Sequence, residues 1–231
     1  MFSGMKDVKH SFFEVTYNLD TTESRTRRTQ KEDYDTNILC EDCDNRILGA
    51  NLENYAKTTM YGKDINPELA PQCKNFKNPK DGAEYSICTN IDYGKLKLFL
   101  LSILWRSSIT CRPMFKEVNL GEKHEETIRK MIYENIIPSE LEYPILMTSF
   151  MRTEHDLKNL IGQPKRIKMK GGLNGYVFLM DSIQFLFAVN SPDHRIPDYM
   201  KKMTLKENGE MMIAHLPNGK ELEFLNLLLN K

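Results

Sequence analysis

Two cysteines three positions apart have the spacing in this sequence that is best suited to chemistry. Cys40 and Cys43 form a C-x-x-C motif, and the segment after them is expected to be a helix. A turn entering a helix points both sulfur atoms in one direction, which is how many zinc sites place two of their four ligands. The same spacing supports disulfide chemistry when one thiol has a low pKa. The motif therefore leaves open a zinc site, a redox-active pair and two ordinary thiols.

A structural zinc site needs two more ligands than this motif supplies. Cys73, Cys88, Cys111 and His10 could provide them, but their spacings match no standard zinc pattern. The first residues of the chain carry charges where an export signal would be apolar. We therefore expect a cytoplasmic location, in which all five cysteines remain thiols or bind metal.

Two short segments are locally basic, although the whole chain has 32 Lys+Arg and 32 Asp+Glu residues and no net charge. Proteins that bind nucleic acid mainly through its phosphates usually carry a basic excess, so binding here would need a local patch. Each segment is a candidate for binding an anion or nucleic acid, or is a solvated face. Their basic residues are Arg25, Arg27, Arg28 and Lys31 in the first segment, and Lys165, Arg166, Lys168 and Lys170 in the second.

Other polar residues have simpler interpretations. Arg106 follows Trp105 at the end of an apolar run, where it either pairs with a carboxylate or binds an anion through its planar guanidinium group. Residues 124–126 (His-Glu-Glu) lie at the expected start of a helix, where the helix dipole favours acidic side chains. The usual short motifs of nucleotide hydrolysis, dinucleotide binding, zinc proteolysis and serine hydrolysis do not occur in the sequence.

Hydrophobic patterning predicts an α+β protein with a helical central part (44–137) followed by a strand-rich C-terminal part (143–231). The two parts are interpreted as domains covering 1–137 and 143–231, or as one compact domain. Expected helices are 44–60, 93–107, 122–135, 153–161 and 221–229; expected strands are 11–17, 143–150, 165–170, 176–180 and 183–189; a loop is expected at 61–84 and a hairpin turn at 207–210. Neither of the two most apolar stretches, 96–105 and 176–189, reaches the about 20 residues that span a bilayer, so no membrane association is expected.

Three blocks of the chain together resemble a family of uncharacterised bacterial proteins. The blocks are NILCEDCDNRILGANLENYA, IDYGKLKLFLLSILWRSSI and FKEVNLGEKHEETIRKMIYE, and the similarity covers about residues 25–150. Fuller members of that family resemble an HNH-like treble clef at the N-terminus. They carry an early C-x-x-C, then a Ser-His-Ile-Ile-Pro-type segment, then a second C-x-x-C.

The resemblance implies roles for individual residues of this chain. Cys40 and Cys43 match the second thiolate pair, residues 28–30 match a short Arg-x-Gln stretch, and His10 is the counterpart of the histidine that would act as a general base. The first C-x-x-C is missing here, and no proline follows His10. These departures remove half of the zinc ligands that would anchor such a fold.

Two functions of different classes follow from these observations. The favoured hypothesis is a non-enzymatic interaction or assembly protein of a bacterial system, such as phage defence, that binds another protein or a second copy of itself. The alternative is a metal-dependent HNH-like nuclease or nucleic-acid-binding protein with zinc at Cys40 and Cys43. A thiol redox role for the same pair is a third hypothesis. The missing thiolate pair favours the first, because function depends on a complete site.

Overall fold

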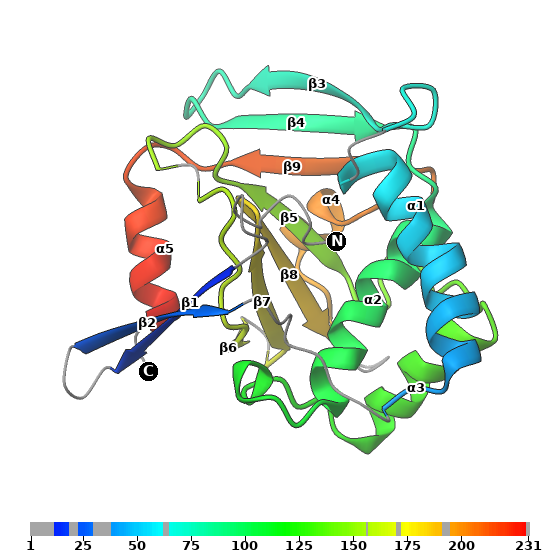
Figure 1. Cartoon of the computed structure of the whole chain (residues 1–231). Helices are drawn as coiled ribbons and strands as arrows, with labels where there is room; N and C mark the ends of the chain where they lie inside the picture. The colour runs from blue at the N-terminus through cyan, green and yellow to red at the C-terminus, as the bar shows by residue number, and fades with distance from the viewer. Residues whose placement is uncertain are drawn as a thin grey trace.

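The computed structural model describes residues 12–18, 23–29, 38–61, 65–155, 157–169, 172–190 and 195–229. They form a seven-stranded mixed sheet that packs against helices, and a separate two-stranded sheet (Figure 1). This arrangement confirms the predicted α+β class.

The large sheet has the strand order β3-β4-β9-β5-β8-β7-β6, with every neighbouring pair antiparallel except β5 and β9, which are parallel. The small sheet pairs β1 with β2. The strands are β1 (Phe12–Asn18), β2 (Glu23–Thr29), β3 (Gln72–Lys77), β4 (Glu84–Thr89), β5 (Ile145–Ser149), β6 (Lys165–Lys168), β7 (Asn174–Met180), β8 (Ile183–Val189) and β9 (Met211–His215). The large sheet thus takes strands from both sides of the segment between residues 137 and 143.

The helical elements lie mostly in the centre of the chain. They are η2 (Cys43–Glu53), α1 (Asn54–Ala56), η3 (Lys57–Tyr61), α2 (Tyr93–Ile109), η4 (Pro113–Phe115), α3 (Glu122–Tyr133), α4 (Asp198–Met203) and α5 (Lys220–Leu229). The expected helix at 44–60 is confirmed, but η2 and η3 have the wider π-helical turn. That wider turn suits the sequence, because Leu48, Leu52 and Ala56 recur at every fourth position and all three are buried.

One face of the large sheet packs against η2, α1, α2 and α3. Alternation along the strands places Met147, Phe185, Phe187 and Met211 on this face, in the same core cluster as the leucines of α2. Helix α2 is apolar on nearly all sides and is buried along most of its length, as its sequence predicts. No helix in the described part of the chain is long and apolar enough to cross a bilayer.

The opposite face of the sheet is covered by the two C-terminal helices. Met200 of α4 packs in a cluster with Leu146 and Ala188, and Phe224 of α5 packs with Val177. In Figure 1, α5 lies on the side of the sheet away from α2 and α3. The sheet is therefore the middle of three layers.

Three local predictions were wrong. Residues 61–84 contain strand β3, whose six residues are all exposed. Strand β3 could not be recognised from hydrophobic patterning, because an edge strand has one neighbouring strand and can form with little apolar surface. No helix forms in the described residues of 153–161, where Leu157 and Asn159 have φ values of +50° and +57°. The turn before Glu210 is present, but it joins α4 to β9 and closes no hairpin, because β9 pairs with β4 and β5.

Candidate functional site

The C-x-x-C thiols lie together where the first long helix begins. The two Sγ atoms of Cys40 and Cys43 are 2.7 Å apart, and the backbone N–H of Cys43 donates to the Cys40 sulfur at 3.4 Å. Cys40 is exposed and Cys43 is half-buried. The predicted convergence of the two sulfur atoms is therefore present, with one of them open to solvent.

The two thiols differ in acidity because they share one hydrogen bond. That bond with Cys43, and next the Cys43 backbone N–H, lower the pKa of the Cys40 thiol. The same hydrogen bond between the two thiols raises the pKa of Cys43. A hydrogen bond with the hydroxyl of Tyr133 partly offsets this rise. Cys40 is thus the sulfur that ionises first, as expected for the first cysteine of such a motif at a helix start.

Helix α3 supplies Tyr133, whose hydroxyl contacts the Cys43 thiol. Burial, and next the contact with Cys43, raise the pKa of Tyr133 to about 12, so its hydroxyl remains a hydrogen-bond donor at neutral pH. The ring of Tyr133 packs edge-on against Trp105 of α2, with 6.1 Å between ring centroids. The guanidinium of Arg129 lies over its other side at 5.3 Å. Tyr133 therefore has a fixed position beside the thiols.

Two cysteine thiolates are half of the four ligands that a structural zinc site needs. Among the described residues, no group of three or more His, Cys, Asp or Glu side chains could hold a metal ion. His10, the histidine implied by the family resemblance, lies outside the described residues, as do Lys31 and Lys170. Any further zinc ligands would have to come from outside the described part of the chain or from another chain.

The first basic segment forms strand β2 of the small sheet. Arg25, Arg27 and Arg28 are all exposed there. Arg27 makes a 2.6 Å ion pair with Glu14 of β1, and Arg28 lies over the ring of Phe13 at 5.9 Å. Sequence patterning predicted β1 but missed β2, because its residues are almost all polar and its hydrogen bonds depend on β1.

The two-stranded sheet, called here the ribbon (β1 and β2), exposes apolar side chains. Phe13 is 64% exposed and Val15 is 63% exposed. The alternation of a strand places these two side chains on the same face of the ribbon and Glu14 on the other face. Figure 1 shows the ribbon projecting beside the main sheet, to which it adds no strand.

The second basic segment forms edge strand β6 and is only partly available for binding. Arg166 and Lys168 are exposed on one face, as the alternation predicted. Lys165 is half-buried on the opposite face, and its Nζ pairs with Glu117 at 2.9 Å. This segment therefore offers two exposed cations in its described part, and the third is neutralised.

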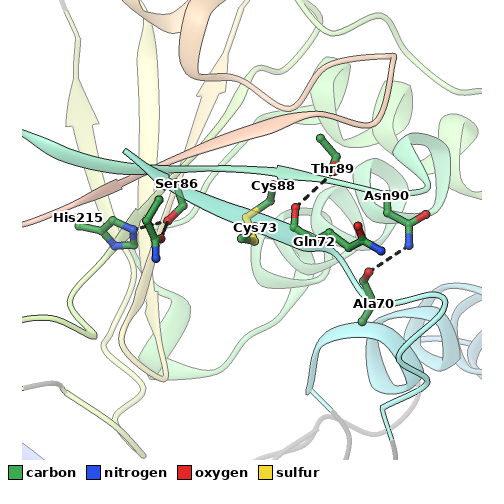
Figure 2. Close-up of a disulfide and its surroundings, with 9 residues drawn as sticks. Ala70, Gln72, Cys73, Ser86, Cys88, Thr89, Asn90 and His215 are labelled. Carbon is green, nitrogen blue, oxygen red and sulfur yellow. Dashed lines mark hydrogen bonds between the residues drawn. A yellow bond between two sulfur atoms is a disulfide. The ribbon is translucent and has the colours of Figure 1, made fainter. Parts of the chain in front are cut away.

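A disulfide joins β3 to β4 and corrects one expectation. Cys73 and Cys88 are direct cross-strand partners and are bonded to each other (Figure 2), so the expectation that all five cysteines remain thiols or bind metal was wrong for these two. The spacing of the two cysteines could not reveal the bond, because the segment of Cys73 was expected to be a loop. Cys40, Cys43 and Cys111 are free thiols.

Next to the disulfide, a serine and a histidine lie close enough to suggest a nucleophile and its base. The Oγ of Ser86 is 2.6 Å from Nε2 of His215 and donates to the Oδ1 of Asn75 at 2.7 Å. Figure 2 shows Ser86 and His215 pointing toward each other from β4 and β9. Ser86 is buried, with 4% of its surface exposed. Burial, and next the charge of Arg152, lower the pKa of His215. The cluster therefore links strands β3, β4 and β9 through side-chain contacts.

The contacts of Arg106 and His124, two polar residues on the helices, are defined in the structure. Arg106 pairs with Glu53 of η2 at 2.8 Å, which agrees with the structural interpretation of that arginine. Nδ1 of His124 is 2.9 Å from the hydroxyl of Tyr143. Sequence analysis missed the buried lysine of α2, Lys97, whose only signal was a charge inside an apolar run.

In comparisons with known proteins, no protein-family model, no curated protein and no solved structure matches this chain. Its function therefore has to be argued from the residues themselves.

Proposed function

We propose that this protein is a non-enzymatic interaction and assembly protein, and that the ribbon binds its partner. The observation that carries the proposal is the exposure of Phe13 and Val15 on one face of a sheet that has two strands within the described part of the chain.

An isolated two-stranded ribbon is at best marginally stable in water, and independent stability needs more strands or a covering element. Exposed aromatic residues on such a surface are typical of interfaces, whose cores are enriched in Phe, Tyr and Trp. A partner that covers Phe13 and Val15 would supply the apolar contact that the exposed face of the ribbon lacks.

The partner that we propose to test first is a second copy of the chain. Two ribbons that pack by their apolar faces form a two-layered unit, in which each ribbon covers the apolar side chains of the other. The ion pair of Glu14 and Arg27 lies on the other face of the ribbon, outside this interface, whereas Arg28, the cross-strand partner of Phe13, lies over the ring of Phe13.

The test is sedimentation velocity of the full chain over a range of concentrations, with a double variant Phe13→Ser/Val15→Ser. We expect the wild-type protein to associate and the double variant to remain a monomer. The matched control is Met151→Ser/Leu222→Ser, which removes two side chains of comparable exposure, 54% and 52%, outside the ribbon. The control should associate like the wild type.

Hydrogen exchange gives an independent test of the same proposal. Ribbon amides should exchange rapidly in dilute monomer and become protected on association. A monomer whose ribbon amides are as protected as those of β7 and β8 would contradict the proposal, because the ribbon would then be stable without a partner.

A second candidate function is nucleic-acid binding of the HNH-like type, with or without cleavage. The observation that favours it is the exposure of Arg25, Arg27 and Arg28 on one strand, in the segment that precedes the thiol pair. Zinc bound to Cys40 and Cys43 would give this segment a fixed structure, and His10 would be the general base of a nuclease.

This alternative predicts salt-dependent binding of a labelled DNA or RNA duplex. Arg25→Gln/Arg28→Gln should weaken the binding and its salt dependence, whereas the control Lys74→Gln/Lys80→Gln, at exposed lysines elsewhere, should not. One zinc ion per chain that is lost in Cys40→Ser/Cys43→Ser, with cleavage lost in His10→Ala, would favour the nuclease. Equal binding by both double variants would count against a nucleic-acid site on the ribbon.

A further inference from the structure

The thiol pair has the geometry for a reaction that the proposed interaction function does not use. The Sγ atoms of Cys40 and Cys43 are 2.7 Å apart, whereas a disulfide bond is about 2.05 Å long. Forming the bond therefore requires the sulfur atoms to move by less than about 1 Å, within the flexibility of the two side chains at a helix start.

The two sulfur atoms are not equivalent in access. Cys40 is exposed and can meet a disulfide in solution, whereas Cys43 is half-buried and lies against Tyr133. The N–H of Cys43 points at the Cys40 sulfur and stabilises a negative charge there. An exposed attacking thiol with a shielded neighbour is the arrangement that two-step thiol exchange requires.

We propose that Cys40 and Cys43 form a reversible intramolecular disulfide by exchange with a low-molecular-weight disulfide, with Cys40 attacking and Cys43 resolving. This inference is independent of the ribbon and of its partner. Disulfide formation and zinc binding use the same two sulfur atoms and exclude each other. An experiment that detects either one therefore distinguishes them.

The reaction balances with the small disulfide as the oxidant. The Cys40 thiolate attacks one sulfur of the reagent RS–SR and forms a mixed disulfide with it. The S–S bond of the reagent breaks, and RS⁻ leaves. Cys43, on losing its proton, then attacks the Cys40 sulfur of the mixed disulfide and displaces the second thiolate. The protein loses two protons and two electrons, and the small disulfide becomes two molecules of RSH.

The other cysteines provide an internal control. Cys111 is an exposed free thiol, and it forms no disulfide with another cysteine in the described part of the chain. It can form only a mixed disulfide with the reagent. Cys73 and Cys88 are already bonded to each other.

The experiment equilibrates the purified full chain with mixtures of reduced and oxidised glutathione, quenches with acid, alkylates the remaining thiols and analyses the peptides by mass spectrometry. In the wild type and in Cys111→Ser, we expect a peptide with Cys40 and Cys43 that lacks two hydrogen atoms and carries no glutathione. Cys43→Ser should retain one glutathione on Cys40. Cys40→Ser should retain several-fold less on Cys43.

Three results would overturn the proposal. The first is a pair that stays reduced in mixtures in which Cys111 is modified. The second is independent glutathione adducts on Cys40 and Cys43 of the wild type. The third is one bound zinc ion per chain that protects both thiols until a chelator removes it. If a serine variant fails to fold, the wild type and Cys111→Ser alone decide among these outcomes.

Discussion

The ammonium group of Lys97 donates a 2.8 Å hydrogen bond to the backbone carbonyl oxygen of Tyr143, and the lysine is fully buried. This contact ties the second turn of α2 to the residue that precedes β5 by two positions. Burial lowers the pKa of Lys97 to about 7, and the more distant carboxylates of Glu142, Glu140 and Glu207 act in the opposite direction. Tyr143 has a φ of +48°, so the lysine stabilises a carbonyl in an uncommon backbone conformation.

This lysine should make stability depend on pH. The folded-state pKa of about 7 is below the ordinary value of 10.5, so between these values the unfolded chain binds a proton that the folded chain does not. The free energy of unfolding should therefore rise with pH across this window, by at most about 1.4 kcal/mol per pH unit. Urea unfolding of the wild type and of Lys97→Met at pH 7, 8 and 9 measures the difference. Parallel pH profiles for the two proteins would show that Lys97 does not titrate in this way.

The ion pair between Arg106 and Glu53 should contribute little to stability. Its side chains are 29% and 39% exposed, so water screens the attraction. We expect Glu53→Gln to lower the free energy of unfolding by less than about 1 kcal/mol. Leu52→Ala, at the buried neighbouring position, should lower it by about 2–5 kcal/mol. Denaturant unfolding of both variants checks this. Equal losses would mean that the ion pair holds the helix to α2 as strongly as the buried leucine does.

Much of the fold could be predicted because its signals are local. The apolar run of α2 and the alternation of β7 and β8 each determine an element without reference to the rest of the chain. Strands β2 and β3 could not be predicted, because both are polar and are formed only by pairing with β1 and β4. The segment around Leu157 looked helical from its composition, but positive φ values and a bridge from Ile161 to β7 replace the helix there.

The candidate site was predictable only in part, for a similar reason. The spacing of Cys40 and Cys43 showed that their sulfur atoms could converge. The position of Tyr133 beside them depends on the packing of α3, about ninety residues later in the chain, and no local pattern reports it. The pairing of Lys165 with Glu117 is likewise a tertiary contact, and it removes one cation from the basic strand.

The Cys73–Cys88 disulfide should stabilise the protein by restricting its unfolded chain. The two cysteines are 15 residues apart, and closing a loop of that length is worth about 3 kcal/mol in the chain-entropy treatment. We expect Cys73→Ala/Cys88→Ala to lower the free energy of unfolding by about that amount under non-reducing conditions. Cys111→Ala, at an exposed free thiol, should change it by less than about 0.5 kcal/mol. A reductant that leaves the unfolding midpoint of the wild type unchanged would contradict this.

The turn between α4 and β9 should tolerate no side chain at Gly209. This residue has a φ of +77°, and a Cβ atom built on it would collide with the backbone carbonyl oxygen of Ile91. The carbonyl of Gly209 in turn accepts a hydrogen bond from the N–H of Ile91 at 3.4 Å, so the two backbones cannot easily separate. Gly209→Ala therefore combines backbone strain with a steric clash and should displace the turn from the segment that precedes α2.

Gly121→Ala is the matched control, because its φ is +74° and nothing lies within 4 Å of an added Cβ. It should cost about 1–3 kcal/mol for the conformational strain alone. Gly209→Ala should cost more, because the clash with the carbonyl oxygen of Ile91 is added to the strain of its positive φ. Thermal and urea unfolding of the two variants separate these contributions. Equal losses would mean that Ile91 moves aside freely, and that the contact between this turn and the start of α2 contributes nothing to the fold.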